Sequence, residues 1–254
     1  MVSISGEKPF ESSSDSFDSY KDDLVAVIHL KGNVFEMATD LLLKEAFFGK
    51  IRSAYRVPDI KALLILSDDS ALGEERYIEF EKSLMESGDN AMKLILEENA
   101  LCQFIRLLLA SDKLIIIGVR GSVIGAFLGS ILSADYRIAS ESSSFSFLDV
   151  KHEMLPQGAL SYFLPRYIGM TNTKKILFGG SSLTAVKACE LGLIDEVVAN
   201  EIFEKKCIEI AKNMTHIPGG IARLAKRLVK GDLKELEACF QADSRQLKSS
   251  SNIM

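Results

Sequence analysis

The sequence predicts an α/β fold for this chain of 254 residues. Short apolar runs with many β-branched residues, such as residues 24–30, residues 60–66 and Leu114–Val119, alternate with longer segments of helical periodicity. Strands that alternate with helices favour parallel pairing through right-handed crossovers. The length and the 47% hydrophobic content are sufficient to bury one sizeable core.

The predicted elements follow one another in a regular order. The first strand covers residues 24–30, where Val25 and Val27 carry the β-branched signal, and a helix over residues 34–55 is expected to end before Pro58. The other predicted strands are residues 60–66, 114–119, 136–139, 144–148 and 196–198. The other predicted helices are residues 76–111, 126–134, 161–167, 172–178 and 185–191, and a helical tail begins at residue 217.

The chain divides into three predicted parts. Residues 1–21 are acidic and rich in serine without an apolar run, so we expect a mobile arm there and no secretory signal. Residues 22–200 are the predicted α/β core. Residues 201–254 are a predicted helical C-terminal region with apolar positions such as Ile221 and Leu224.

Composition excludes several classes of function. The net charge is −5, the pI is near 5.4, and no basic cluster suggests nucleic acid. No apolar run is long enough to cross a bilayer, so we expect no membrane partner. The four cysteines are scattered without a CxxC pair or a histidine cluster, which predicts reduced thiols in a cytoplasmic protein and no metal site.

One segment has the layout of an oxyanion site. The strand Leu114–Val119 runs into a turn with Gly121 and Gly125, and a helical run follows. The first amides of a helix have no internal partner, and the helix dipole adds partial positive charge there. Asp149 and Glu153 follow in the sequence as candidate proton-transfer groups. The pattern predicts an enzyme that stabilises an enolate or a tetrahedral oxyanion.

Three segments carry a family resemblance. They read DKLIIIGVRGSVIGAFLGSILSADYRIAS over residues 112–140, FSFLDVKHEMLPQGA over residues 145–159 and GGSSLTAVKACELGLIDEVV over residues 179–198. In this order and spacing they resemble the enoyl-CoA hydratase/isomerase (crotonase) family. The resemblance is dense from about residue 110 to 200 and looser before it. It implies a crotonase-like spiral of ββα units with a C-terminal helical region, and a role in fatty acid metabolism.

The resemblance also implies two backbone donors for the oxyanion, each worth about 3–4 kcal/mol. The second donor is the amide of Ala126. Its neighbours Gly125 and Phe127 are expected to contact the substrate, although the family has a glycine at the Phe127 position. The first donor lies in SALGEERYIEF, as the amide of Glu74 without a gap or of Gly73 with one deletion. The alternative for Ala126 is that the helix start is only packed into the core. The alternative for Gly73 is that it is an ordinary turn glycine.

The catalytic carboxylates depart from the family pattern. Hydratases of the family use two glutamates to hold and activate one water molecule. The first position is Gly129 in this chain, and the second aligns with Asp149, which is one methylene shorter than glutamate. Glu153 and His152 are further titratable groups nearby. The alternative is that Asp149 is only a loop residue.

The resemblance therefore implies an acyl-CoA thioester as substrate, with CoA as part of that substrate and no separate cofactor. One surviving carboxylate suits an isomerase or another proton-transfer reaction of the lyase type better than water addition. The alternative is a catalytically degenerate acyl-CoA-binding or partner subunit of the same fold. A serine peptidase of this fold ranks lower, because Ser122 and Ser130 have no evident histidine partner. The family likeness further implies a homotrimer or a hexamer.

Overall fold

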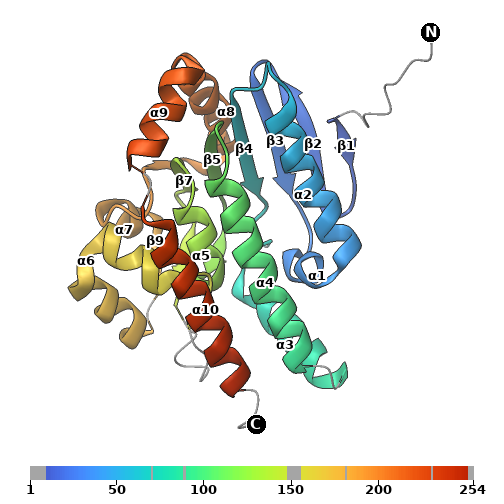
Figure 1. The fold of residues 1–254 in the computed structure, drawn as a ribbon, viewed down its shortest axis with the longest axis vertical. Coiled ribbons are helices and arrows are strands. Elements are labelled where there is room, and N and C mark those ends of the chain that lie inside the picture. The colour runs from blue at the N-terminus through green and yellow to red at the C-terminus, as the bar shows by residue number, and fades with distance from the viewer. Residues whose placement is uncertain are drawn as a thin grey trace.

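The computed structural model describes residues 10–69, 71–87, 90–147, 156–180, 182–229 and 231–250. Among these residues the strands form two sheets. The larger sheet has seven strands in the order β1-β2-β3-β4-β5-β7-β10, and the smaller has three in the order β6-β8-β9. The predicted α/β class is confirmed (Figure 1).

The larger sheet consists of β1 (Ser12–Ser13), β2 (Phe17–Asp22), β3 (Val25–Leu30), β4 (Ala62–Ser67), β5 (Leu114–Val119), β7 (Tyr136–Ser140) and β10 (Glu196–Val198). The smaller consists of β6 (Ser122–Ile124), β8 (Ser144–Ser146) and β9 (Leu183–Thr184). The helices are α1 (Val34–Thr39), α2 (Leu41–Arg56), α3 (Glu74–Ser87), α4 (Asn90–Leu109), α5 (Gly125–Leu132), α6 (Leu160–Gly179), α7 (Ala185–Glu190), the 3-10 helix η2 (Asn200–Ile202), α8 (Phe203–Met214), α9 (Gly219–Val229) and α10 (Leu233–Ser250).

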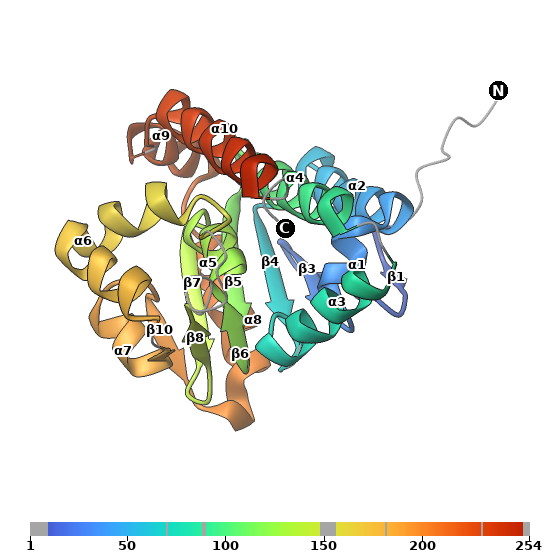
Figure 2. The same ribbon diagram turned by 90° about the horizontal axis from the view of Figure 1, so that it is seen from below.

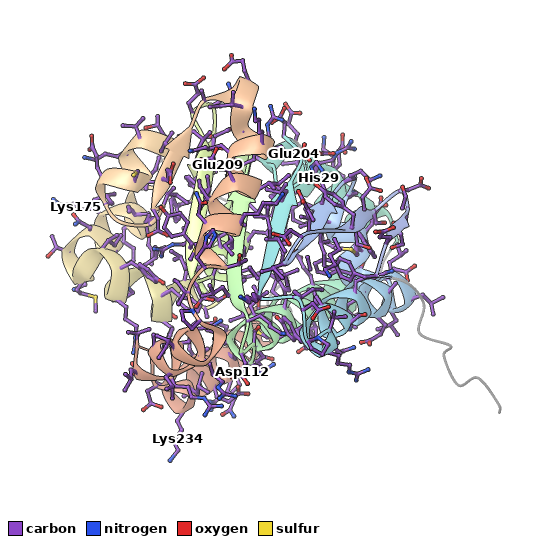
Figure 3. The ribbon with its side chains drawn as sticks, turned by 90° about the horizontal axis from the view of Figure 1, so that it is seen from above. His29, Asp112, Lys175, Glu204, Glu209 and Lys234 are labelled. Carbon is purple, nitrogen blue, oxygen red and sulfur yellow. The ribbon has the colours of Figure 1, made fainter. Side chains whose placement is uncertain are left out.

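The central strands β3, β4, β5, β7 and β10 are parallel, and helices cover both of their faces. Ile115 and Ile117 of β5 point into a core shared with α1, α2, α4 and α5. Leu114 and Ile116 point into a second core with α8. In Figure 3, Glu204 and Glu209 mark α8 on one side of the sheet and Lys234 marks α10 on the other. Burial on both faces explains why these strands are continuous apolar runs.

The predicted arm at residues 1–21 is wrong in its second half. Residues 12–13 form β1, and Phe17–Asp22 forms β2, which pairs antiparallel with β3. Alternate residues Phe17 and Ser19 are buried, which is the period of a half-buried strand. The serine-rich composition concealed this alternation. The division of the chain into three parts otherwise remains a prediction.

The helix predicted at residues 34–55 is two helices. Asp40 has an extended backbone, and its carboxylate accepts hydrogen bonds from the amides of Leu42 and Leu43. It therefore ends α1 and caps α2. The helices predicted at residues 161–167 and 172–178 lie on either side of a kink at Gly169 within α6, where φ is 72°. The region predicted as helical at residues 76–111 corresponds to two helices, α3, which begins two residues earlier at Glu74, and α4.

Candidate active site

The candidate site lies at the carboxyl ends of the parallel strands, where α3 and α5 begin. The backbone amide of Ile124 donates a hydrogen bond of 3.0 Å to the carbonyl oxygen of Leu72. Leu72 directly precedes Gly73, and Ile124 is the N-cap of α5. The candidate donors from the two segments are therefore brought to neighbouring positions, as Figure 2 shows for the starts of α3 and α5.

The start of α5 is buried and has no side-chain cap. Ile124 makes no side-chain hydrogen bond to the first turn, and all residues of the helix from Gly125 onward are buried. The first amides of a helix, including that of Ala126, lack an acceptor within the helix. A buried helix start without a cap is suited to an anionic oxygen. The side chains of α5 pack into the core, as the alternative expects, and the role of the Ala126 amide as an oxyanion donor stays a prediction.

Gly121 fixes the approach of the β5–β6 turn to the loop after β4. Its φ is +65°, and an added Cβ would lie 2.0 Å from the carbonyl oxygen of Asp69. Only glycine combines this backbone conformation with this closeness. Arg120 reinforces the contact, since its Nε lies 3.2 Å from Asp69 Oδ1. The glycine predicted as part of a functional turn therefore has a structural requirement of its own.

Gly73 and Glu74 lie at the start of α3. The carbonyl oxygen of Gly73 accepts a hydrogen bond from the amide of Tyr77 at 3.1 Å, as expected for a helix N-cap. The carboxylate of Glu74 accepts a hydrogen bond of 3.3 Å from Ser146 Oγ on β8. Both amides belong to this helix start, so both remain candidates for the first oxyanion donor.

The position of the missing glutamate has no room for a side chain. A Cβ added at Gly129 would lie 1.6 Å from the carbonyl oxygen of Gly158. A Cβ at Gly158 would in turn lie 2.1 Å from the carbonyl oxygen of Ala126. The backbone at Gly158 therefore occupies the space that a side chain on this face of α5 would need.

A small apolar cavity lies beside the candidate donors. It has a volume of about 50 Å³, and its wall includes Leu72 and Phe127 together with Phe47 and Leu101. The ring of Phe127 packs edge-on against Phe35 with a centroid distance of 5.1 Å. An apolar cavity of about 150 Å³ admits benzene, so this one suits a smaller apolar group.

The predicted catalytic residues Asp149 and Glu153, and also His152, lie outside the described residues. The chain reaches this segment from the described strand β8. Ser146, at the end of that strand, contacts Glu74 at the start of α3. The roles of Asp149 and Glu153 therefore stay predictions.

Two carboxyl groups near the site, the buried Glu98 and the half-buried Asp243, were missed by the sequence reasoning. Glu98 on α4 is 2% exposed, and burial raises its pKa against the opposing effects of Cys102, the Gly158 amide and Arg106. Burial and then the charge of Glu98 raise the pKa of Asp243 on α10 to about 6. The only sequence signal was a pair of acids inside the apolar stretch LILEENALC.

The thiols beside these carboxyls do not have the properties of nucleophiles. Burial, followed by the charge of Glu98, raises the pKa of Cys102, and burial also raises the pKa of Cys239. A reactive cysteine needs a lowered pKa. Across the described ranges, no group of three or more His, Cys, Asp or Glu side chains is arranged to hold a metal ion. No helix there is long and apolar enough to cross a membrane.

Comparison with known proteins gives a consistent result. Residues 83–253 match the family model described as enoyl-CoA hydratase/isomerase. The enoyl-CoA isomerase/hydratase fer4 of Mycosarcoma maydis is 36% identical over 97 residues, which are 38% of this chain and 35% of that protein. A Mycobacterium tuberculosis protein named "Probable enoyl-CoA hydratase EchA12" is 33% identical over 132 residues, 51% of this chain and 46% of that protein. The matched segments thus span less than half the length of these two relatives.

The fold also matches solved structures. The enoyl-CoA hydratase from Bacillus halodurans aligns with a TM-score of 0.77 over 91% of this chain and 93% of that one. The sequence identity is 21%, so this likeness concerns the fold alone. The predicted crotonase-like fold is confirmed.

Proposed function

Because the match over residues 83–253 shows that this chain belongs to the enoyl-CoA hydratase/isomerase family, we propose that it binds an acyl-CoA thioester and transfers a proton through an enolate. The observation that carries the proposal is the hydrogen bond between Ile124 and Leu72, which joins the starts of α3 and α5. Two helix starts side by side offer two backbone donors for one carbonyl oxygen.

In the proposed mechanism the thioester oxygen accepts hydrogen bonds from the amide of Ala126 and from that of Gly73 or Glu74. A carboxylate, Asp149 or alternatively Glu153, removes the proton at C2 of a 3-enoyl thioester. The C2–H electron pair moves into the enolate, and its negative charge develops on the oxygen that the amides hold. The carboxylic acid then returns the proton to C4, which moves the double bond to C2.

The acyl group is proposed to lie against Gly125 and Phe127, and its end to enter the cavity of about 50 Å³. The dimensions of this cavity favour a short acyl tail. The CoA part is carried by the substrate, so the mechanism uses no separate cofactor. Every proton step is performed by a side chain of this protein.

Isomerisation is proposed over hydration because of Gly129. Water addition needs two carboxylates to orient and deprotonate one water molecule, and the backbone of Gly158 fills the place of one of them. A proton shift between two carbons of the same substrate needs a single base, which removes a proton from one carbon and then protonates the other. The geometry around α5 therefore favours the reaction with one carboxylate.

The test compares two substrates in heavy water. We expect 3-hexenoyl-CoA to be converted to the conjugated 2-enoyl thioester, which is followed by ultraviolet absorbance. The carboxylic acid exchanges its proton with heavy water before it protonates C4, so mass spectrometry should detect deuterium in part of the product. Hydration of crotonyl-CoA should be slower than about 1 s⁻¹, a tenth of a typical turnover number. Hydration at about 10 s⁻¹ would contradict the proposal.

The alternative is a degenerate subunit that binds acyl-CoA without turnover. The absence of a side chain at Gly129 is the observation that favours it. Tight binding of both thioesters without any deuterium exchange at C2 would support this alternative, since even a stalled enolate exchanges that proton.

The backbone donor can be tested by removing its N–H. Ala126→Pro should lower turnover by about 10²–10³-fold, the cost of one oxyanion donor. Val186→Pro is the matched control, because Val186 is also the second residue of its helix and is 56% exposed. Equal losses in the two variants, with helix content retained, would remove Ala126 from the site.

We also propose a homotrimer or hexamer. The outer face of α9 is apolar and exposed at Ile221, Leu224 and Leu228. Exposed apolar stripes of this kind are typical of interfaces between subunits. Light scattering at micromolar concentration should give a mass of at least three chains, and a monomer would contradict the proposal.

A further inference from the structure

The loop between β4 and α3 carries the first oxyanion donor of the proposed function. It runs from Asp68, directly after β4, to Gly73, directly before α3, and the two candidate amides are those of Gly73 and Glu74 at its end. A backbone donor stabilises an oxyanion when it lies about 2.7–3.1 Å from the developing charge. The contacts that fix this loop therefore affect the chemistry of the site.

The neighbouring strand β3 holds the first residue of the loop by two contacts. Nε2 of His29 lies 2.8 Å from Asp68 Oδ1. The backbone amide of Asp68 donates a hydrogen bond of 3.1 Å to the carbonyl oxygen of Leu30, the last residue of β3. Both the side chain and the backbone of Asp68 are therefore held at the end of this strand.

The strand on the other side, β5, holds the next residue of the loop. Arg120 directly follows β5, and its Nε lies 3.2 Å from Asp69 Oδ1. Its backbone amide donates a hydrogen bond of 3.4 Å to Oγ of Ser67, the last residue of β4. The carboxylates of two successive loop residues are thus paired in opposite directions, one with each neighbouring strand.

Neither His29 nor Arg120 is placed to touch the acyl group. Side chains alternate along a strand, so His29 shares the face of Val25 and Val27, which pack in the core with α8. The guanidinium of Arg120 lies over the ring of Phe203 on α8, at 5.6 Å from its centroid. The apolar cavity is lined mainly by residues of the core on the opposite face. These two side chains can therefore act on the site only through the loop.

The rest of the loop is held closely enough to pass on a displacement. The amide of Ala71 donates a hydrogen bond of 3.2 Å to the carbonyl oxygen of Asp68, which closes a turn. Ala71 and Leu72 are buried, and Leu72 accepts the hydrogen bond from Ile124 that joins the two helix starts. A shift at Asp68 therefore moves the amides that follow Leu72.

We propose that His29 and Arg120 are positioning residues, which hold Asp68 and Asp69 from the two neighbouring strands and so set the position of the first oxyanion donor. This inference rests on the proposed function, in which that donor is assigned. Exposed ion pairs contribute little to stability, and the side chains of Asp68 and Asp69 are 45% and 69% exposed. The two pairs are therefore expected to affect turnover more than the free energy of unfolding.

The first experiment removes both carboxylates without changing the size of the side chains. Asp68→Asn/Asp69→Asn should lower kcat for 3-hexenoyl-CoA by about 10-fold, with KM and the melting temperature nearly unchanged. The loss is smaller than the about 10²-fold that a misplacement by 1 Å can cause, because the backbone contacts of the loop remain. An unchanged kcat would overturn the inference.

A double-mutant cycle tests whether Arg120 acts through Asp69. Asp69→Asn and Arg120→Gln should each lower kcat by about 3–5-fold, and the two changes together should lower it no further, because residues in contact do not act additively. Additive losses would show that Arg120 acts in another way and would overturn its positioning role.

Lys31→Gln is the matched control. Lys31 directly follows β3 and pairs with Asp18 of β2 at 2.8 Å, with side chains that are 31% and 34% exposed. The variant removes an ion pair at the same end of the same strand without touching the loop, so kcat should stay unchanged. A loss equal to that in Asp68→Asn/Asp69→Asn would overturn the inference.

Hydrogen–deuterium exchange tests the inference without any substrate. The amides of Ala71 and Ile124 donate to carbonyl oxygens of the loop. They should exchange faster in Asp68→Asn/Asp69→Asn than in Lys31→Gln, and equal exchange would overturn the inference. If the wild-type protein shows no turnover, the proposed function fails, and faster exchange at these two amides still supports the positioning role.

Discussion

The two ends of the larger sheet differ in how their polar groups are satisfied. At the amino ends, Asp135 accepts hydrogen bonds from the amide of Ile115 at 2.7 Å and pairs with Lys226 at 2.6 Å. Next to it, Arg137 makes hydrogen bonds of 2.7 and 2.6 Å to Asp195. These side chains form hydrogen bonds and ion pairs that connect segments far apart in the sequence, and of the Arg137 guanidinium only Nη1 is buried without a hydrogen bond.

At the carboxyl ends, some side chains pair as well, Arg120 with Asp69 and Ser146 with Glu74, but the backbone donors of one helix start have no side-chain acceptor. The first turn of α5 has no side-chain cap, and Oε2 of Glu98 is buried without a hydrogen bond. Structural ends of a sheet satisfy their own polar groups, whereas a site keeps donors available for a ligand. The comparison separates the roles of two family-like motifs: Asp135 and Arg137 hold the sheet together, and the turn before Ala126 is proposed to serve chemistry.

The largest expected effect concerns the carboxyl ends of the larger sheet, where the catalytic base is predicted. Asp149→Asn keeps the size of the side chain and removes the base, so turnover should fall by about 10²–10⁴-fold while acyl-CoA affinity stays nearly unchanged. Urea unfolding should show little change in stability. If Asp149→Asn retains activity and Glu153→Gln abolishes it, the base is Glu153. If neither affects a measurable turnover, neither carboxylate is the base.

Gly129→Ala lies at the carboxyl ends of the sheet but should lower both stability and turnover, so it tests whether the roles of the two ends are separate. The added Cβ would meet the carbonyl oxygen of Gly158 at 1.6 Å, and overpacking of this kind costs about 3 kcal/mol. Chemical denaturation and turnover should both show a loss. Gly49→Ala in α2 is the control, since nothing lies within 4 Å of its added Cβ and stability should rise slightly. A neutral Gly129→Ala would contradict the close contact.

Arg137→Ala should affect stability alone. It removes the guanidinium from Asp195, which keeps only the hydrogen bond from the backbone amide of residue 137. The arginine side chain is 8% exposed, so we expect a loss of about 2–3 kcal/mol by urea unfolding. Turnover of the folded protein should be unchanged. Lys187→Ala breaks an exposed pair with Glu190 and should cost less than about 0.5 kcal/mol. A large fall in turnover in Arg137→Ala would show that the two ends are coupled.

The smallest effect concerns the pH dependence of stability. Burial raises the pKa of Asp243 from 3.8 to about 6, and the facing groups are Glu98, Cys239 and the amide of Ala159. A raised pKa means that the folded state binds the proton more tightly than the unfolded state does. Stability is therefore lost as pH rises through about 6. Asp243→Asn should raise the melting temperature above that pH by roughly 2–4 °C and have little effect near pH 4. An equal shift at both pH values would contradict this.

The sequence alone determined the α/β class and most central strands, because each strand is a local apolar run. It also located the glycine turn and the helix start at Ala126, since their signals lie within a few neighbouring residues. The family resemblance followed from the same local motifs. The break between α1 and α2 was missed, because a single capping residue, Asp40, determines where one helix ends and the next begins.

Only the tertiary structure decided which groups meet at the site. Glu98 and Asp243 are far apart in the chain and come together because α10 packs on α4, and no local pattern encodes that contact. The Gly158 carbonyl beside Gly129 and the hydrogen bond from Ile124 to Leu72 are likewise contacts between distant segments. Sequence periodicity shows which face of an element is buried, whereas the partners on that face depend on how the whole chain packs.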